Sequence, residues 1–232
     1  MCRGRDKRTC TELGTDADAW SKHAPMMPPV WFDEQLATFT EAVRLASAGD
    51  VLASRDQLGL IRSEDLQNWY IEHGQQSGVF RDRHFRRAKP AFAGSIDPLA
   101  SPDRFAKEVF TRDGYRCRYC GIRLVPKEVL MAFSKVVGRD AFRPTGTNLE
   151  RHGIVLIFRA NADHVVPRKL GGRTAVDNLV SACWCCNYGK SSFTLEQIGV
   201  DDPRGKPVAA ADGWDGLTSH LTGLRTNAVR IK

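Results

Sequence analysis

Residues 154–167 read IVLIFRANADHVVP. The first five of these residues form the most β-prone run in the chain, because β-branched and aromatic side chains favour strands. Asp163 and His164 follow soon afterwards, so we expect them at the end of a strand. A carboxylate is a hard ligand for a divalent cation, and a histidine can act as a general base near neutral pH. The stretch therefore predicts a strand, Ile154–Phe158, that leads into a metal-binding and proton-accepting pair.

The chain continues with a loop, a second short strand and a helix. Residues 168–173 contain paired glycines and three cationic side chains, which is typical of an exposed turn. Residues 178–180 predict the second strand, and Cys183 then opens a helix that carries Asn187 and Lys190 in its first turns. Together these segments predict an α+β fold around the acidic residue and the histidine.

Seven cysteines are present, and four of them form two CxxC pairs. The first pair is Cys117 and Cys120, and 62 residues separate it from the second pair, Cys183 and Cys186. Two such pairs in a reducing compartment are typical of a tetrahedral zinc site with four thiolates. Cys185 leaves the second pair ambiguous, although the two-residue spacer favours Cys186. The alternative is two unrelated pairs, one of them redox-active.

The composition is typical of a soluble globular protein, since 42% of the 232 residues are hydrophobic and 26% are charged. No apolar stretch approaches about 20 residues, so we expect no membrane-spanning helix and no membrane partner. The first ten residues, MCRGRDKRTC, are charged and no apolar run follows them. We therefore expect no signal peptide and a cytoplasmic location, where thiols are kept reduced and metal binding is favoured over disulfides.

The positive charge is concentrated in the middle of the chain. Residues 101–190 hold 16 Lys and Arg against 8 Asp and Glu, a net charge of +8, whereas the whole chain carries +7. A basic segment attracts polyanions, above all the phosphate backbone of nucleic acid. The alternative is a solvated basic surface that binds no partner.

Residues 31–75 predict a small helical region. Asp33 can cap a first helix, which Gly49 ends. Its apolar positions recur every three to four residues: Leu36, Phe39, Val43 and Ala46. Val51–Leu58 predicts a second helix, and Ser63 can cap a third. The apolar residues of the third helix are Leu66, Trp69 and Tyr70. We further expect a protein partner, or a second copy of the chain, to bind through this region.

Shifts in composition divide the rest of the chain. We expect a flexible tail over residues 1–30 and a basic linker over residues 76–100, whose embedded aromatic residue suits a phosphate backbone. A main domain over residues 101–199 begins with a helix at Ser101-Pro102. A C-terminal tail with a short helix follows over residues 200–232.

Four motifs follow one another in the main domain: CRYCG from residue 117, ADHVVPRKLGG from 162, DNLV from 177 and CWCCNYGK from 183. In this order they resemble the HNH endonucleases, over roughly residues 104–195. The resemblance implies a ββα-metal (His-Me finger) core held together by a four-cysteine zinc site, with residues 101–199 as the nuclease domain. Residues 127–152 are then an insertion, which either contacts the substrate or lies on the surface.

The resemblance also implies a role for the polar residues of the motifs. Asp163 resembles the acidic ligand of a catalytic divalent cation, and His164 resembles the base that activates water. Asn178 resembles the residue whose amide or backbone positions the histidine ring. Asn187 stands where the family has a final His or Asn, the second protein ligand, so the chain is an HNN variant. Oxygen ligands suit Mg²⁺ or Mn²⁺ better than a catalytic zinc ion.

We therefore predict a metal-dependent endonuclease that hydrolyses DNA, with structural zinc and with Mg²⁺ or Mn²⁺ as the catalytic ion. RNA stays open as the substrate. The candidates for phosphate contacts are Arg168, Lys169, Arg173 and Lys190. One alternative is a non-catalytic, zinc-containing module that binds nucleic acid and needs no Asp163-His164 pair. Another is a protein-interaction module centred on residues 31–75.

Overall fold

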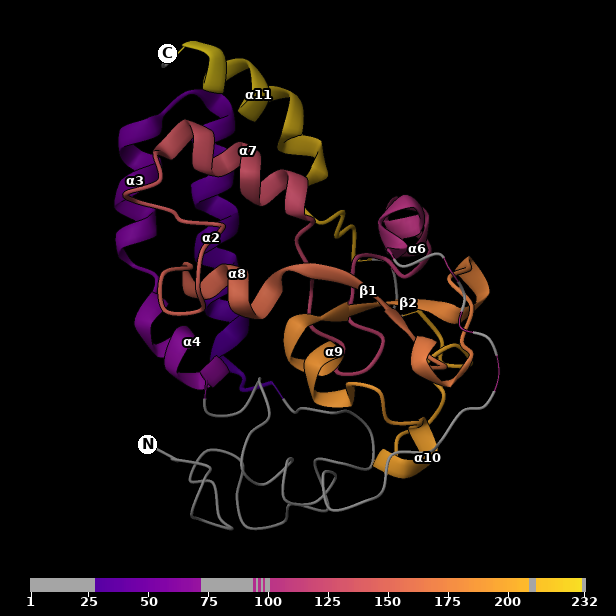
Figure 1. The fold of residues 1–232 in the computed structure, drawn as a ribbon. Helices are drawn as coiled ribbons and strands as arrows, with labels where there is room; N and C mark the ends of the chain where they lie inside the picture. The colour runs from indigo at the N-terminus through magenta and orange to yellow at the C-terminus, as the bar shows by residue number, and fades with distance from the viewer. Residues whose placement is uncertain are drawn as a thin grey trace.

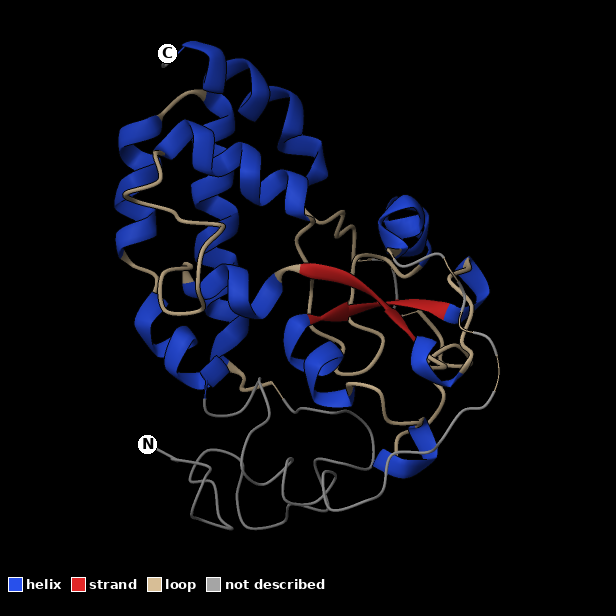
Figure 2. Cartoon of the chain, viewed as in Figure 1, coloured by secondary structure: helices blue, strands red, loops and turns tan. Residues whose placement is uncertain are grey.

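The computed structural model of the protein describes residues 28–71, 94, 96, 98, 101–208 and 212–230. In these residues it contains helices and a two-stranded sheet, which agrees with the predicted α+β class (Figures 1 and 2). The predicted flexible tail lies outside the described residues up to residue 27, and so does the predicted linker apart from three single positions. None of the described helices is both long enough and apolar enough to cross a lipid bilayer.

The elements form two groups, which lie on opposite sides of Figure 1. The first group adds two helices to the region predicted from residues 31–75, and from here on the whole group is called the helical region. It contains α2 (Trp31–Ala48), α3 (Val51–Gly59), α4 (Ser63–Trp69), α7 (Lys127–Val137) and α11 (Leu221–Arg230). The second contains α6 (Ala106–Arg112), β1 (Ala160–His164), β2 (Leu179–Cys183), α9 (Trp184–Lys190) and α10 (Leu195–Ile198). Helix α8 (Gly153–Phe158) connects the groups. The short 3-10 helices are η2 (Pro102–Phe105), η3 (Arg168–Leu170), η4 (Val176–Asn178) and η5 (Thr218–His220).

Helix α2 forms as its apolar spacing predicts. The four predicted positions are all buried: Leu36, Phe39, Val43 and Ala46. Gly49 ends the helix in the left-handed conformation, at a φ of 94°, which glycine reaches at low cost because it has no Cβ. The start differs from the prediction, because Val30 is the N-cap and Asp33 lies inside the first turn. There its negative charge still favours the positive end of the helix dipole.

Helices α3 and α4 also lie where the sequence predicts them. The three residues predicted for the inner face of α4 are buried: Leu66, Trp69 and Tyr70. Ser63 does not cap α4 but is its first residue, with Arg62 as the N-cap. The Ser63 hydroxyl instead accepts a hydrogen bond from the backbone N–H of Gly153 at 2.8 Å. Ser63 therefore ties α4 to α8.

Two helices from distant parts of the chain, α7 and α11, cover α2 (Figure 1). The ring of Phe39 in α2 lies 5.1 Å from Phe133 of α7 and 5.4 Å from Phe142. Residues 127–152, which we predicted to decorate the surface or contact substrate, therefore supply part of this apolar core. The buried face of α2 is covered by the chain itself. That a partner or a second copy binds this region stays a prediction.

The run Ile154–Phe158 is helical and is not the strand that we predicted. Every residue of α8 is buried, and His152 caps the helix by accepting a hydrogen bond from the N–H of Ile154 at 3.3 Å. A short continuous apolar run fits a buried helix as well as a buried strand, because it has no period that separates them. Contacts with α4 on one side and α9 on the other favour the helix here.

Strands β1 and β2 pair in antiparallel orientation, with Asp163 opposite Val180. The Asp163-His164 pair therefore does end a strand, as predicted, although this strand begins at Ala160. Helix α9 follows β2 directly, and it contacts both strands. The helix predicted from Ser101-Pro102 is also present, as η2 and α6, and the Ser101 hydroxyl caps it. These elements together position the side chains of the candidate site.

Candidate functional site

The two CxxC pairs meet in one cysteine cluster. The sulfur atoms of four residues all lie within 4.8 Å of one another: Cys117, Cys120, Cys183 and Cys186. The pairs meet because the turn that carries the first pair binds β2, with the N–H of Arg118 donating to the carbonyl oxygen of Ser181 at 2.8 Å. Cys185 is buried but does not belong to the cluster. The CxxC spacing therefore predicted the four thiols that the fold brings together. Such a set of thiols could hold a metal ion.

The C-terminal segment holds the turn of the first cysteine pair in place. Asp212 forms ion pairs with Arg116 and Arg123, which lie on either side of that pair in the sequence. Arg118 donates to the carbonyl oxygen of Pro203 at 2.8 Å. Residues that we predicted as a tail therefore contact the candidate metal centre.

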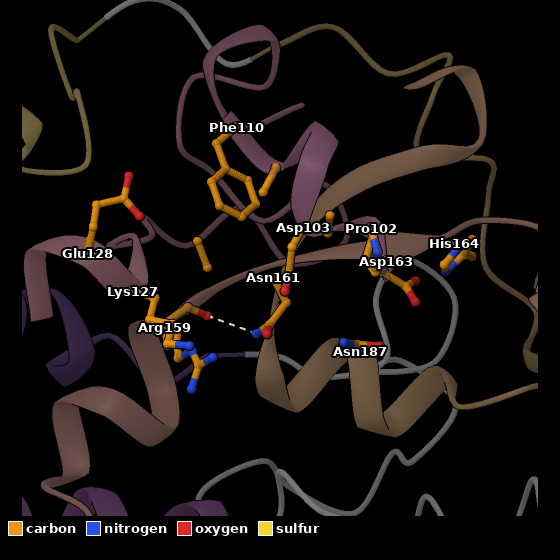
Figure 3. A pocket seen from close by; sticks show the side chains of 13 residues that line it. Pro102, Asp103, Phe110, Lys127, Glu128, Arg159, Asn161, Asp163, His164 and Asn187 are labelled. Carbon is orange, nitrogen blue, oxygen red and sulfur yellow. Dashed lines mark hydrogen bonds between the residues drawn. The ribbon is translucent and has the colours of Figure 1, made fainter. Parts of the chain in front are cut away.

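A cleft of about 570 Å³ opens over β1 (Figure 3). It is lined by the whole of β1, by Asn187 of α9 and by residues from η2, α6 and the start of α7. Figure 3 shows Asp163 and His164 next to each other on the strand, with Asn187 nearby on the helix. The fold thus brings these three predicted site residues to one cleft.

Asp163 is only 6% exposed, and two side chains bind its carboxylate. The hydroxyl of Tyr119 donates to its Oδ2 atom at 2.7 Å, and the Nζ atom of Lys190 lies 3.2 Å from the same oxygen. Burial raises the pKa of Asp163, while the charge of Lys190 and the Tyr119 hydrogen bond oppose that rise. The site is therefore built to keep a carboxylate out of bulk water.

The burial of Lys190 disfavours the phosphate contact that we predicted for it. Its side chain is fully buried, and its Nζ atom donates to the backbone oxygen of His164 at 2.7 Å. The ion pair with Asp163 explains the inward orientation, since a buried ammonium group requires a charge partner. Lys190 therefore links α9 to the end of β1.

The imidazole of His164 is partly exposed, and its Nε2 atom lies 3.0 Å from the Oγ1 atom of Thr174. Thr174 is itself buried, with 3% exposure. This contact fixes the orientation of the ring at the mouth of the loop between the strands.

Asn178 binds that loop through its side chain. Its Oδ1 atom accepts a hydrogen bond from the N–H of Val166 at 2.9 Å, and its Nδ2 atom donates to the carbonyl oxygens of Val166 and Arg173 at 3.1 and 2.9 Å. Gly172 allows this closure, because a Cβ there would lie 1.8 Å from the Val166 oxygen. We expected the amide or the backbone of Asn178 to position the histidine. Its amide closes the loop that leads into Thr174, and its backbone oxygen accepts a hydrogen bond from the N–H of Val165, the residue after His164, at 2.9 Å.

An antiparallel strand pair ends in Asp163-His164, Asn178 closes the loop between its strands, and a helix with Asn187 follows. Residues 154–193 match the family model of the HNH endonucleases. The predicted resemblance is therefore confirmed for this part of the chain, the HNH segment. CRYCG lies outside the match. None of the curated proteins and none of the solved structures compared with the chain matches it.

Three of the four cations predicted to contact phosphate lie in the loop of the HNH segment. Arg168 is partly buried, and Lys169 and Arg173 are exposed. None of these three side chains lines the cleft. They lie where a polyanion can reach them from outside.

Sequence reasoning missed Tyr119 and Thr174, which contact the two central residues of the HNH segment. Tyr119 lies inside the first CxxC pair, so its proximity to a cysteine cluster was visible. Its contact with Asp163 was not visible, because 44 residues separate the two. Thr174 follows the paired glycines, and nothing in its neighbours indicates that it faces a histidine.

Proposed function

We propose that this protein is a metal-dependent endonuclease that hydrolyses phosphodiester bonds of DNA. The observation that carries the proposal is the convergence of Asp163, His164 and Asn187 on one cleft of the HNH segment. An HNH domain indicates nuclease activity in general, and the net charge of +8 over residues 101–190 favours a polyanionic substrate. RNA is the alternative substrate.

We also propose that β1, β2 and α9 form a ββα-metal core within a nuclease domain of residues 101–199. The direct succession of a paired strand and α9 supports this assignment. The cysteine cluster would bind zinc through four thiolates. A zinc ion with four protein ligands keeps no open position for water, so its role is structural.

The oxygen donors of the cleft fit a cation of the Mg²⁺ type. The Asp163 carboxylate and the Asn187 amide oxygen would hold it, and both are hard ligands. Two protein ligands leave coordination positions for water and for phosphate oxygens, as Mg²⁺ sites usually do. When bound, such a cation neutralises charge on the phosphate and on the leaving 3′-oxygen.

His164 acts as the general base in this proposal. A neutral imidazole near pH 7 can accept the proton of the attacking water. Thr174 holds its Nε2 atom at 3.0 Å and so restricts the ring to one orientation. Asn178 contributes by closing the loop, while Arg168, Lys169 and Arg173 contact backbone phosphates.

The alternative function is a non-catalytic module that binds nucleic acid through the same fold. The burial of Asp163 disfavours it, because removing a carboxylate from water costs several kcal/mol even when a partner is present. A module that only binds phosphates gains nothing from a buried negative charge beside its cleft.

A cleavage assay tests the proposed function. The protein is incubated with plasmid, branched, single-stranded DNA and RNA substrates in Mg²⁺ or Mn²⁺, and then with EDTA. Asp163→Asn and Asn187→Ala should each lower activity and raise the Mg²⁺ concentration that half-maximal activity requires. Asp103→Asn changes another carboxylate that lines the cleft and should leave that concentration unchanged. Cleavage that survives EDTA, or no cleavage of any substrate, contradicts the proposal.

A further inference from the structure

Two arginines share one tryptophan ring at the end of the cleft away from His164. The guanidinium carbons of Arg151 and Arg159 lie 4.8 and 4.7 Å from the centroid of the Trp184 ring. The indole N–H of Trp184 donates to the Oδ1 atom of Asn161 at 2.8 Å, which fixes the ring. Cation–π contacts therefore hold both guanidinium groups in place, although their charges repel each other.

Among the described residues no carboxylate forms an ion pair with either guanidinium group, although the charge of Asp103 acts on Arg159 from farther away. In the part of the chain that the structure describes, no ion pair within 4.0 Å involves Arg151 or Arg159, and the Nε atoms of both are buried without a hydrogen-bond partner. Arg151 donates from Nη1 to Asn148 at 3.0 Å. Burial, and next the charge of Arg151, lower the pKa of Arg159. Two cations held in this way are stabilised when an anion binds to them.

Arg159 lines the same cleft as the candidate catalytic residues (Figure 3). Side chains alternate along a strand, and Arg159 is already extended, with φ −62° and ψ 127°. Arg159, Asn161 and Asp163 therefore share one face of the strand. At a rise of about 3.3 Å per residue, Arg159 and Asp163 lie about 13 Å apart along it. One phosphate group does not span that distance, so the two ends of the cleft serve different phosphates.

The helical region supports the arginine pair. The side-chain amide of Gln67 in α4 donates to the carbonyl oxygens of Leu149 and Arg151 at 3.3 and 2.5 Å. The ring of Tyr70, which follows α4, lies 6.5 Å from the Trp184 ring. Helix α4 thus fixes the segment from which Arg151 reaches Trp184.

We propose that Arg159 and Arg151 together bind a backbone phosphate of the substrate other than the one that is cleaved. This inference rests on the proposed function, because it names a further binding site for the same substrate. The planar fork of a guanidinium group matches phosphate oxygens. Asp103 and Glu128 also line the cleft, and their negative charges offset positive charge there. The proposed binding therefore depends on direct contacts between the two guanidinium groups and the phosphate.

The test measures DNA binding separately from cleavage. Full-length protein that carries His164→Ala is titrated with a short labelled DNA duplex, and fluorescence anisotropy gives the affinity at several KCl concentrations. Arg159→Gln and Arg151→Gln are added to this background one at a time. Each should weaken binding and lower the slope of log K against log salt by about 0.9, the value for one phosphate contact on a duplex.

Arg62→Gln is the matched control. Arg62 also lies over a tryptophan ring, 4.4 Å from the centroid of Trp31, but it has Asp65 at 3.7 Å and belongs to the helical region. Its replacement should leave both the affinity and the slope unchanged. Thermal unfolding shows whether each variant is folded, and Arg159→Lys, which keeps the charge, should recover most of the slope.

Unchanged affinity and slope in folded Arg159→Gln and Arg151→Gln proteins would overturn the inference, as would a parent protein that binds no DNA. If Arg159→Gln does not fold, Arg151→Gln decides alone. If the slopes change as expected while the wild-type protein cuts nothing, the phosphate site is supported and the proposed nuclease fails. If the wild type cuts DNA while both variants keep its slope, the proposed nuclease is supported and the phosphate site fails.

Discussion

The core of the helical region and the site of the HNH segment are both buried, but their chemistry differs. Phe39, Phe133 and Phe142 are fully buried and contact one another through their rings, so apolar burial holds this core together. Around Asp163 the buried groups include a phenol, an ammonium group and the cysteine cluster, beside apolar residues such as Val180. The phenol hydroxyl and the ammonium group contribute little hydrophobic free energy. We therefore expect loss of a bound metal ion and mutation of the apolar core to destabilise different parts of the molecule.

The largest effect that this comparison predicts follows from Cys186→Ser. Structural zinc contributes about 10–16 kcal/mol of apparent binding free energy in small modules, so losing one thiolate should unfold the HNH segment. We expect the variant to retain no zinc, and hydrogen exchange should show that β1 and β2 lose protection while α2 keeps most of its own. Zinc content and exchange rates of the two regions are the measurements.

Cys185→Ser is the control for this experiment. Cys185 is buried beside the cluster but does not belong to it, so the variant should keep its zinc. Zinc lost from Cys185→Ser and retained by Cys186→Ser would show that the ligand assignment is wrong. Equal loss of hydrogen-exchange protection in α2 and β1 of Cys186→Ser would show that the helical region depends on the zinc site as much as the HNH segment does.

Phe133→Ala tests the opposite region. Removing a fully buried phenylalanine from a packed core costs about 3–5 kcal/mol in the free energy of unfolding. Urea unfolding measures this loss, and the zinc content of the folded protein should stay at the wild-type value. A folded variant that has lost its zinc would contradict the separation of the two regions.

A pH-dependent effect follows from His152, which caps α8 between the two regions. Burial lowers its pKa to about 4, below the ordinary value of 6.5. Between these pH values the unfolded chain binds a proton that the folded protein does not, so stability falls as the pH drops from about 6.5 to about 4. At about 1.4 kcal/mol per pH unit, the contribution of this residue is about 3 kcal/mol.

His152→Asn is the variant that isolates this effect, because its side-chain oxygen can still accept a hydrogen bond from the N–H of Ile154. Urea unfolding at both pH values should give a smaller loss of stability in the variant than in the wild type. Acid also weakens zinc binding, but it does so in both proteins. An equal loss in both would show that His152 is not the group that titrates.

Features set by local spacing could be predicted from the sequence. The apolar stripe of α2 has the helical period, and the CxxC pairs have the spacing of a metal site, so both follow from neighbours in the chain. Asp163 and His164 were predicted from their residue types at the end of a strand, and Asn187 through the family resemblance. The cleft contains all three.

Features that depend on distant contacts could not be predicted. Residues 154–158 became a helix because α4 and α9 bury them from two sides, which their uniform apolarity does not reveal. Lys190 turned inward because a buried carboxylate lies 3.2 Å from its Nζ atom, so its charge did not indicate phosphate contact. Arg151, Arg159 and the Trp184 ring that both arginines contact likewise come from three separate segments.

The most direct test of the account compares wild-type protein with His164→Ala in a cleavage assay with Mg²⁺. The account predicts a fall in cleavage rate of about 10²–10⁴-fold, the usual contribution of a positioned general base. Zinc content and DNA affinity should stay unchanged, because the imidazole belongs neither to the cysteine cluster nor to a phosphate contact. Full activity of the variant, or loss of its zinc and fold, would contradict the account.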